Sequence, residues 1–276
     1  MPKLGASFHR TFALNRPALV QILRLVRERQ DTSAEGRVLD FDAIAQGTTL
    51  GPVYIASMRR YALGAGLVDE EERLTAMGEA VCGGDPDLQK TASCWVLHYS
   101  LCCPHGAGPI YWNLLVRKKL RPGDELDRAQ LGAVIRDATK EAGGDEINDK
   151  TASEAATVFL GTYSKSDGLG PLGLLEQVEA GKYLVKEPEP PSLWVFAYVL
   201  ADYWRANWGE VPGVNLMQVT EPGGPGALLV MGSGTVNRYL GDLQSAGFAV
   251  VQRRSPPFQL NRNWSSPSQF LERLYD

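Results

Sequence analysis

Hydrophobic positions recur at helical spacing in the first part of the chain. Apolar residues between Pro17 and Gln30 fall on one broad helical face, and Pro17 suits the first turn of a helix. The same reasoning predicts a short helix over 40–45, with Asp40 as its cap. A longer helix is predicted over 52–65, between the glycine-containing turn 47–51 and a stop at Gly66.

A short hairpin is expected after these helices. Leu67–Val68 and Leu74–Thr75 flank an acidic turn at 69–72. Helix, turn, helix and then a hairpin is the order of a winged helix, so residues 1–80 are predicted to form an N-terminal winged-helix-like module.

The middle of the chain is predicted to be mainly helical. Residues 81–187 form one region, and its helices are expected over 88–101, 110–120, 126–142 and 151–163. The proline-rich segment 187–191 cannot be helical and is the clearest linker signal in the sequence.

The last part loosely repeats the first pattern. A helix begins after Ser192, the glycine-rich segment 222–234 follows, and a second helix is expected over 235–246. Strands over 248–253 and 258–260 would then form a second wing. The predicted fold class is therefore mainly α with small β-hairpin wings, with winged-helix-like modules at 1–80 and 192–276 around a helical middle.

Composition narrows the class of protein. The 276 residues are 44% hydrophobic and 22% charged, which excludes disordered, collagen-like and low-complexity architectures. No apolar run is long enough for a signal peptide or a membrane span, and adjacent Cys102 and Cys103 suit a reducing compartment. We expect a cytoplasmic protein with no membrane partner.

Charge is unevenly distributed along the chain. The net charge is −4, yet residues 1–31 carry +4 and residues 226–262 carry +3, around a segment of −5 at 65–90. Because phosphate contacts dominate DNA affinity, the local charge matters more than the total. Solvated surface charge is the alternative. The predicted DNA-binding residues are Arg10, Arg16, Arg59, Arg60, Arg238, Arg253 and Arg254.

Two groups of residues could hold a metal ion. Asp85 and Asp87 form a tight carboxylate pair with Lys90 nearby, which would suit magnesium and phosphodiester chemistry. Cys94, His98 and Cys102 share one helical face and are zinc-ligand types, but thiols around a core histidine are the favoured interpretation.

One glycine-rich turn has a possible phosphate role. Gly232–Thr235 precedes a helix and could cradle a phosphate with backbone amides. It lacks the spacing and lysine of a P-loop, so a turn into a recognition helix is the favoured interpretation.

Several short patches together carry a family resemblance. They are Ser7–Phe12, Leu50–Gly51 with Arg59–Tyr61 and Gly66–Leu67, Leu74–Thr75 with Gly78, Asp85–Pro86 with Leu88, Trp95 with Leu97–Tyr99, Ile110–Trp112 and Thr162–Tyr163. In this order and spacing the series resembles the SspB-like family, bacterial proteins of unassigned function encoded beside DNA phosphorothioation genes. The resemblance is best over 7–165.

The sequence departs from the family pattern at two places. Arg10 stands where a glutamate usually follows the opening histidine, and the lysine–asparagine pair near Tyr54–Ile55 is absent. The resemblance therefore implies no DNA or metal contact at these two places in this sequence.

The resemblance implies a function. It implies a DNA-nicking or DNA-handling subunit that uses magnesium and opens the backbone so that partners can insert sulfur. The implied partners are DNA, a cysteine desulfurase, a sulfurtransferase and an ATPase. The leading hypothesis is a magnesium-dependent nicking endonuclease, with Asp85 and Asp87 as metal ligands and His98 in acid–base or structural work. The alternatives are a non-catalytic winged-helix adaptor that positions partner enzymes on DNA, and a transcriptional regulator.

Overall fold

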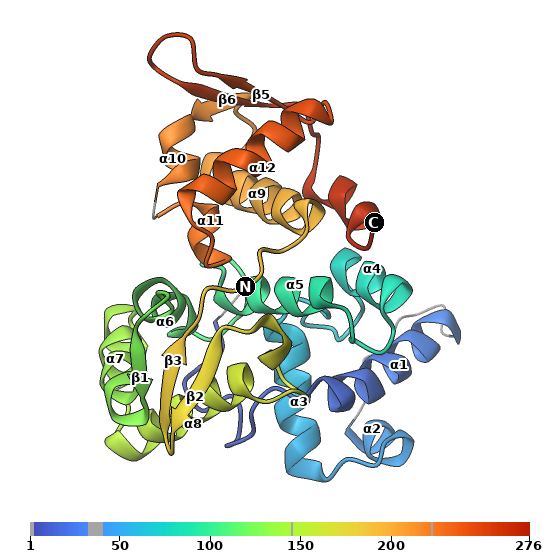
Figure 1. The fold of residues 1–276 in the computed structure, drawn as a ribbon. Coiled ribbons are helices and arrows are strands. Elements are labelled where there is room, and N and C mark those ends of the chain that lie inside the picture. The colour runs from blue at the N-terminus through green and yellow to red at the C-terminus, as the bar shows by residue number, and fades with distance from the viewer. Residues whose placement is uncertain (1–2, 33–40, 145, 222) are drawn as a thin grey trace. The chain divides into compact units, whose positions relative to one another are not determined.

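The structure is a computed structural model that describes residues 3–32, 41–144, 146–221 and 223–276, and the predicted cap Asp40 lies outside them. The chain divides into two compact units, residues 1–188 and residues 189–276 (Figure 1). Both units are mainly helical, and each contains one three-stranded antiparallel sheet. The mainly α class with small β elements is therefore confirmed.

The first unit is built from helices of moderate length. They are α1 (Arg16–Thr32), α2 (Phe41–Gly47), α3 (Pro52–Gly64), α4 (Ala76–Gly84), α5 (Thr91–Cys102), α6 (Trp112–Lys119), α7 (Arg128–Glu141) and α8 (Asp149–Ser164), followed by the short 3-10 helix η1 (Gly170–Leu172). Helix α1 packs on α3, α7 packs along α8, and α5 contacts both α6 and η1 (Figure 1).

Helix α5 forms the centre of this unit. Every residue from Ser93 to Cys102 is buried, as expected for a helix that is apolar all round. Large aromatic side chains pack around it and contribute most to the apolar area removed from water. The fully buried members are Phe8, Tyr61, Trp95, Tyr99, Tyr111, Trp112, Phe159 and Tyr163.

A small sheet covers α7 and α8. Strands β1 (Glu125–Asp127), β2 (Leu175–Glu179) and β3 (Lys182–Val185) are antiparallel in the order β1-β3-β2. The turn between β2 and β3 contains Gly181 at φ +78°, a conformation that glycine adopts without strain. This sheet was not predicted, because its three strands are short and β2 is mostly exposed.

The second unit has a different order of elements. It contains α9 (Leu193–Trp208), β4 (Gly213–Asn215), α10 (Leu216–Thr220), α11 (Pro225–Leu228), α12 (Ser233–Ser245), β5 (Ala249–Gln252), β6 (Gln259–Arg262) and the 3-10 helix η2 (Pro267–Arg273). The sheet order is β4-β6-β5, and α9 packs against α11, α12 and η2. The buried side chains of Phe196, Trp204, Leu240 and Phe270 form its core.

Three expected features differ in detail. Position 80/81, predicted as a domain boundary, lies inside α4. The segment predicted as the first wing is a tight turn with an isolated antiparallel bridge between Val68 and Leu74. The helix expected from residue 126 begins at Arg128, because Leu126 pairs with Tyr183 in the sheet and Asp127 caps the helix.

A helix that crosses a lipid bilayer needs about 20 predominantly apolar residues. Within the part of the chain that the structure describes, no helix combines the length and the apolar character that a membrane crossing requires.

Candidate nucleic-acid interface

The N-terminal turn that precedes α1 has an unusual backbone. Arg10 and Thr11 are consecutive residues with positive φ, +47° and +73°, and neither is glycine. Each such residue costs on the order of 1–3 kcal/mol and persists only when surrounding contacts impose it. Arg10 is exposed on this turn, and so is Thr11.

Helix α3 imposes this conformation. The Ser57 hydroxyl donates to the backbone oxygen of His9 at 2.8 Å, and the Tyr61 hydroxyl donates to that of Phe12 at 3.0 Å. The Phe8 ring also packs edge-on against Tyr61, with 4.8 Å between centroids. Buried contacts at both ends therefore hold the strained residues between them.

The imidazole of His9 lies beneath the turn. Its Nδ1 accepts a hydrogen bond from the Thr11 backbone N–H at 3.0 Å, while its buried Nε2 has no partner among the described residues. Burial lowers the pKa of His9 to about 4. The ring is therefore neutral near pH 7, and it supports the turn rather than supplying positive charge.

Three of the predicted arginines meet at a cleft beside α3. Arg10, Arg59 and Arg60 line a hollow of about 280 Å³. Acidic residues of the turn at 69–72 line its other side, and Arg59 Nε donates to Glu72 Oε1 at 2.5 Å. The charge of Arg59 is therefore balanced. Arg10 and Arg60 are exposed and have no ion-pair partner among the residues that the structure describes.

Arg16 has a different role from the one expected. It is 4% exposed, and its guanidinium donates to the backbone oxygens of Gly168 (2.7 Å), Ser166 (2.6 Å) and Leu88. A buried cation needs such partners, because an unsatisfied one is very costly. The prediction that Arg16 contacts DNA does not fit this burial. The Arg16 side chain instead joins three segments of the first unit.

The two carboxylates of the predicted metal pair lie in different environments, one buried and one exposed. Asp85 is buried and accepts hydrogen bonds from the backbone N–H of Gln89 (2.9 Å) and Lys90 (2.7 Å) and from the Ser93 hydroxyl (2.6 Å). Asp87 is exposed and pairs with Arg24 at 2.6 Å. Asp85 thus shapes the turn before α5, and Asp87 lies on the surface.

His98 is part of the core. It is fully buried, and its Nδ1 shares a 2.7 Å hydrogen bond with the hydroxyl of Tyr163. The same hydroxyl accepts from Trp112 Nε1 at 2.9 Å. Of the two roles considered for His98, this position favours the structural one.

The four cysteines, all of which lie in the described ranges, form no disulfide and are buried. Burial raises the pKa of the Cys102 thiol well above its ordinary value, and it also raises the pKa of Cys94. Across the described ranges, no group of three or more His, Cys, Asp or Glu residues is placed to hold a metal ion. The interpretation of Cys94, His98 and Cys102 as core residues fits these positions.

The second unit presents its arginines beside α12. Val236, Leu240 and Leu243 are buried at helical spacing, which turns Arg238 outward. Gly232, Gly234 and Gly241 lie near or on the helix with open space where a side chain would be. This face therefore combines a cation with room for close backbone approach.

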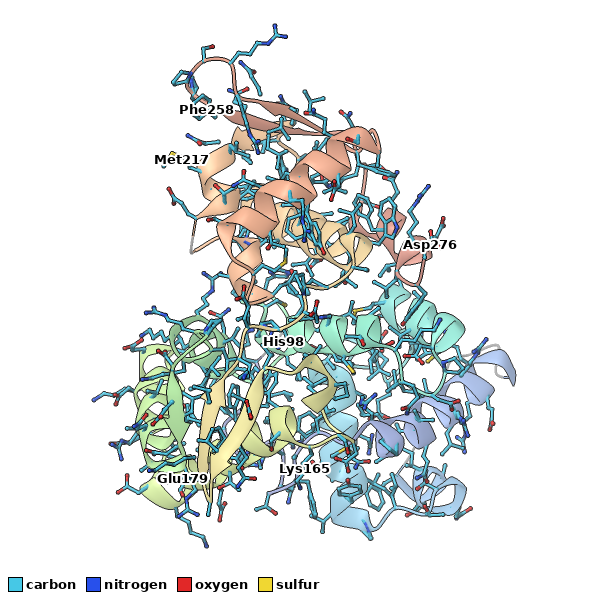
Figure 2. The ribbon with its side chains drawn as sticks, in the orientation of Figure 1. His98, Lys165, Glu179, Met217, Phe258 and Asp276 are labelled. Carbon is cyan, nitrogen blue, oxygen red and sulfur yellow. The ribbon has the colours of Figure 1, made fainter. Side chains whose placement is uncertain are left out.

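The β5–β6 hairpin extends the same face. Arg253 donates to the Asn237 side-chain oxygen at 2.7 Å, which links the hairpin to α12. Arg254 is exposed, with no partner among the described residues. Figure 2 shows Phe258 on the loop of this hairpin, where its ring is 38% exposed.

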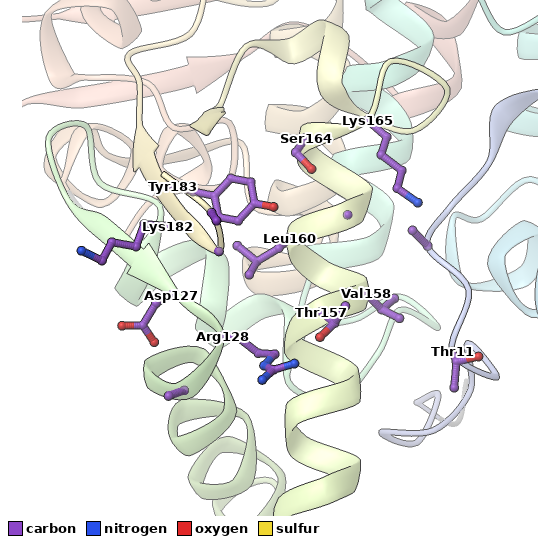
Figure 3. Close-up of a pocket in the computed structure, with 15 residues that line it drawn as sticks. Thr11, Asp127, Arg128, Thr157, Val158, Leu160, Ser164, Lys165, Lys182 and Tyr183 are labelled. Atoms are coloured by element: carbon purple, nitrogen blue, oxygen red, sulfur yellow. The ribbon is translucent and has the colours of Figure 1, made fainter. Parts of the chain in front are cut away.

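A larger groove lies in the first unit. It measures about 680 Å³ and is bordered by the N-terminal turn, the start of α7, the last turns of α8 and the β2–β3 turn (Figure 3). Sequence reasoning missed it because its residues come from four separate segments. The one available signal was the polar spacing Thr157, Gly161, Ser164 and Lys165 on α8.

Comparisons place the chain among known proteins. Two solved structures share the fold: "Magnesium ion-bound SspB crystal structure", at 19% identity, and "SspB crystal structure", at 20%. In both cases the TM-score is 0.77, and the match covers 98% of this chain and 86% of the other. No curated protein matches. A family model described as "Protein of unknown function (DUF4007)" matches residues 7–275. The chain belongs to the DUF4007 family.

Proposed function

We propose that this protein binds duplex DNA through its second unit and acts as a DNA-handling component of a phosphorothioation system. The observation that carries DNA binding is the order of elements in residues 189–276. A helix, a short strand, further helices and a two-stranded hairpin follow one another, with the sheet order β4-β6-β5. In our proposal this order is that of a winged helix, with α12 as the recognition helix and β5–β6 as the wing.

The chemistry of α12 supports this role. Arg238 and Asn237 lie on its outer side, and the open glycines allow a DNA backbone to come close. All basic residues of the second unit are arginines. Arginine presents a rigid fork of donors that matches phosphate oxygens and the edge of guanine, so this choice suits nucleic-acid contact.

The hairpin supplies the second set of contacts. Arg253 is held against Asn237, and Arg254 is free to follow the DNA backbone. In this proposal α12 enters a groove and the hairpin contacts flanking phosphates, which position the protein without reading sequence. Arg10 and Arg60 of the first unit are weaker candidates, because the acidic turn at 69–72 faces them.

Duplex binding is tested by fluorescence anisotropy over a series of salt concentrations. The double variant Arg238→Gln/Arg254→Gln should weaken binding at least roughly tenfold and flatten the log–log salt dependence by about 0.9 for each phosphate that is no longer neutralised. The matched control is Arg205→Gln/Arg262→Gln, which removes the same charge from arginines paired with Asp202 and Glu210. Equally weakened binding in both variants would show that only bulk charge matters and would reject the α12 surface.

Magnesium-dependent nicking is the second candidate. It is supported by the family resemblance and by the name of one similar structure, which mentions a bound magnesium ion. The test is conversion of supercoiled plasmid to open circles with magnesium, against a chelator control. Asp87→Asn is the informative variant, because Asp87 is exposed whereas Asp85 holds a turn. DNA binding without nicking would favour the adaptor role beside a cysteine desulfurase, a sulfurtransferase and an ATPase.

A further inference from the structure

The groove over α8 has the size and shape of a small-molecule site. Its volume of about 680 Å³ lies within the range typical of ligand pockets, roughly 300–1,000 Å³. Thr157, Gly161 and Ser164 follow one another at helical spacing along its floor. Gly161 lets the segment at Ala13 lie close to α8, because a Cβ on Gly161 would lie 3.3 Å from the Ala13 Cβ.

Two positively charged side chains line this groove without pairing to another described residue. Arg128 and Lys165 both line it, both are exposed, and neither side chain has a hydrogen-bond or ion-pair partner among the described residues. The other charged residues of the lining form an ion pair or a hydrogen bond within the protein. Lys182 pairs with Glu179 at 2.9 Å, and Asp127 accepts from the Gln130 backbone N–H at 2.8 Å as the cap of α7. The groove therefore carries positive charge that the protein itself does not neutralise.

The rest of the lining adds hydroxyl groups and apolar surface. Thr11, Thr157, Ser164 and Tyr183 supply hydroxyls from three segments of the chain. Figure 3 shows Tyr183 extending from β3 toward α8, with Leu160 close by on the helix, while Lys165 lies on the opposite side of α8. A ligand that lies across the helix can meet a cation on each side and an aromatic ring on one.

We propose that this groove binds a nucleoside phosphate. Arginine and lysine with nearby hydroxyls are the usual partners of phosphate oxygens, and Tyr183 offers a ring on which a base can stack. A simple inorganic anion would leave most of the groove and its apolar wall unused. The nucleoside phosphate is either a free nucleotide or the terminal nucleotide of a DNA strand, since both present the same chemistry.

This site is independent of the proposed function. It uses residues of the first unit only, whereas duplex binding is assigned to α12 and the β5–β6 hairpin of the second unit. The strained turn at Arg10 and Thr11 connects the two clefts of the first unit, because Thr11 lines this groove and Arg10 lines the cleft beside α3.

Calorimetric titration of the full chain tests the proposal. The probes are the mono- and triphosphates of adenosine, guanosine, cytidine and thymidine, inorganic phosphate, and short single strands with a 5′-phosphate or a 5′-hydroxyl. Saturable binding of at least one nucleotide or of the 5′-phosphorylated strand, tighter than inorganic phosphate, is expected. Free nucleotides binding best identifies the free ligand as the source, and the phosphorylated strand binding best identifies a DNA end.

Variants then locate the binding. Arg128→Gln/Lys165→Gln should weaken it by about tenfold or more, because the ligand loses the cation on each side of α8. Thr157→Trp should also abolish it by filling the groove without changing charge. The matched control Lys140→Gln/Lys150→Gln removes the same charge from exposed positions of α7 and α8 outside the groove, and it should bind as wild type does.

Clear results would overturn the proposal. Absence of binding of every probe by folded wild-type protein would do so, as would inorganic phosphate binding as tightly as any nucleotide. Binding that survives both Arg128→Gln/Lys165→Gln and Thr157→Trp would place the ligand elsewhere. Circular dichroism of each variant separates these results from loss of fold.

Discussion

The Ser57 hydroxyl holds the carbonyl of His9 at 2.8 Å, and this hydrogen bond ties α3 to the strained turn of Arg10 and Thr11. Both groups are buried, so water cannot replace the bond. This turn places Thr11 at the groove over α8 and Arg10 at the cleft beside α3. A small side chain of α3 therefore controls the geometry of both.

Removing that hydroxyl should destabilise the first unit. We expect Ser57→Ala to lower the free energy of unfolding by about 0.5–1.5 kcal/mol, because the His9 carbonyl loses one of its two donors and keeps only the Phe12 N–H. Urea denaturation followed by tryptophan fluorescence measures it. Thr157→Ala is the control, since that hydroxyl donates only to the Ser153 carbonyl on an exposed helix face. Equal stability of the two variants would contradict the role of Ser57.

Acid should weaken the first unit through His9. The pKa of this side chain is about 4 in the folded protein and 6.5 otherwise, so the unfolded chain binds more protons between those values. The stabilisation is complete above pH 6.5 and is lost as the pH falls toward 4, by about 3 kcal/mol at most. Urea midpoints at pH 7.5, 6 and 5 measure this loss. His9→Asn keeps an acceptor for the Thr11 N–H, and its midpoint should fall less; identical slopes would refute the assignment.

Arg16 should matter for stability and not for DNA affinity. Arg16→Met leaves three backbone oxygens without their donor, so a loss of about 3 kcal/mol or more is expected. Arg24→Gln, on the exposed face of the same helix, should cost less than about 1 kcal/mol. Thermal unfolding compares the two. A folded Arg16→Met protein that binds duplex DNA much more weakly than wild type would reverse our interpretation.

The hydroxyl of Tyr163 should stabilise the core more than its size suggests. It is the partner of both His98 Nδ1 and Trp112 Nε1, so Tyr163→Phe leaves two buried polar groups short of a hydrogen bond. A loss of about 2–4 kcal/mol is expected by chemical denaturation. Tyr203→Phe removes an exposed hydroxyl and serves as the control. If Tyr163→Phe lost less stability than the control, His98 and Trp112 would have formed hydrogen bonds with other groups.

Asn237 and Arg253 should act together in duplex binding. Their side chains are joined at 2.7 Å across α12 and the hairpin, so the effects of Asn237→Ala and Arg253→Gln on affinity should not add. A double-mutant cycle by anisotropy measures the coupling. The pair Asn237→Ala with Arg254→Gln has no such hydrogen bond, and its effects should add. Additive effects in both cycles would show that α12 and the hairpin contribute independently to duplex binding, and would contradict the prediction.

Local pattern predicted much of the fold. The helices over 52–65, 110–120 and 151–163 match α3, α6 and α8 closely, because apolar periodicity and glycine or proline stops are local signals. The last helix and hairpin also appear near their expected positions. The small sheet of the first unit was missed, since Leu126 and Tyr183 pair across more than fifty residues of chain.

The candidate sites were harder to predict, and the difference between Arg16 and Arg254 shows why. Both are arginines in locally basic segments, yet one is buried against three carbonyls and the other is exposed. Asp85 and Asp87 diverge in the same way although one residue separates them. Charge type can be read along the chain, but burial depends on distant segments.

The sequence by itself determined the helical class, the central apolar helix α5 and the segregation of positive charge toward both ends, because these follow from local spacing and composition. Only the tertiary structure decided which charges stay exposed and which residues meet at the groove over α8. Contacts such as Arg16 with Gly168 join residues far apart in the chain. Their formation depends on how the whole unit packs, and no local pattern records that.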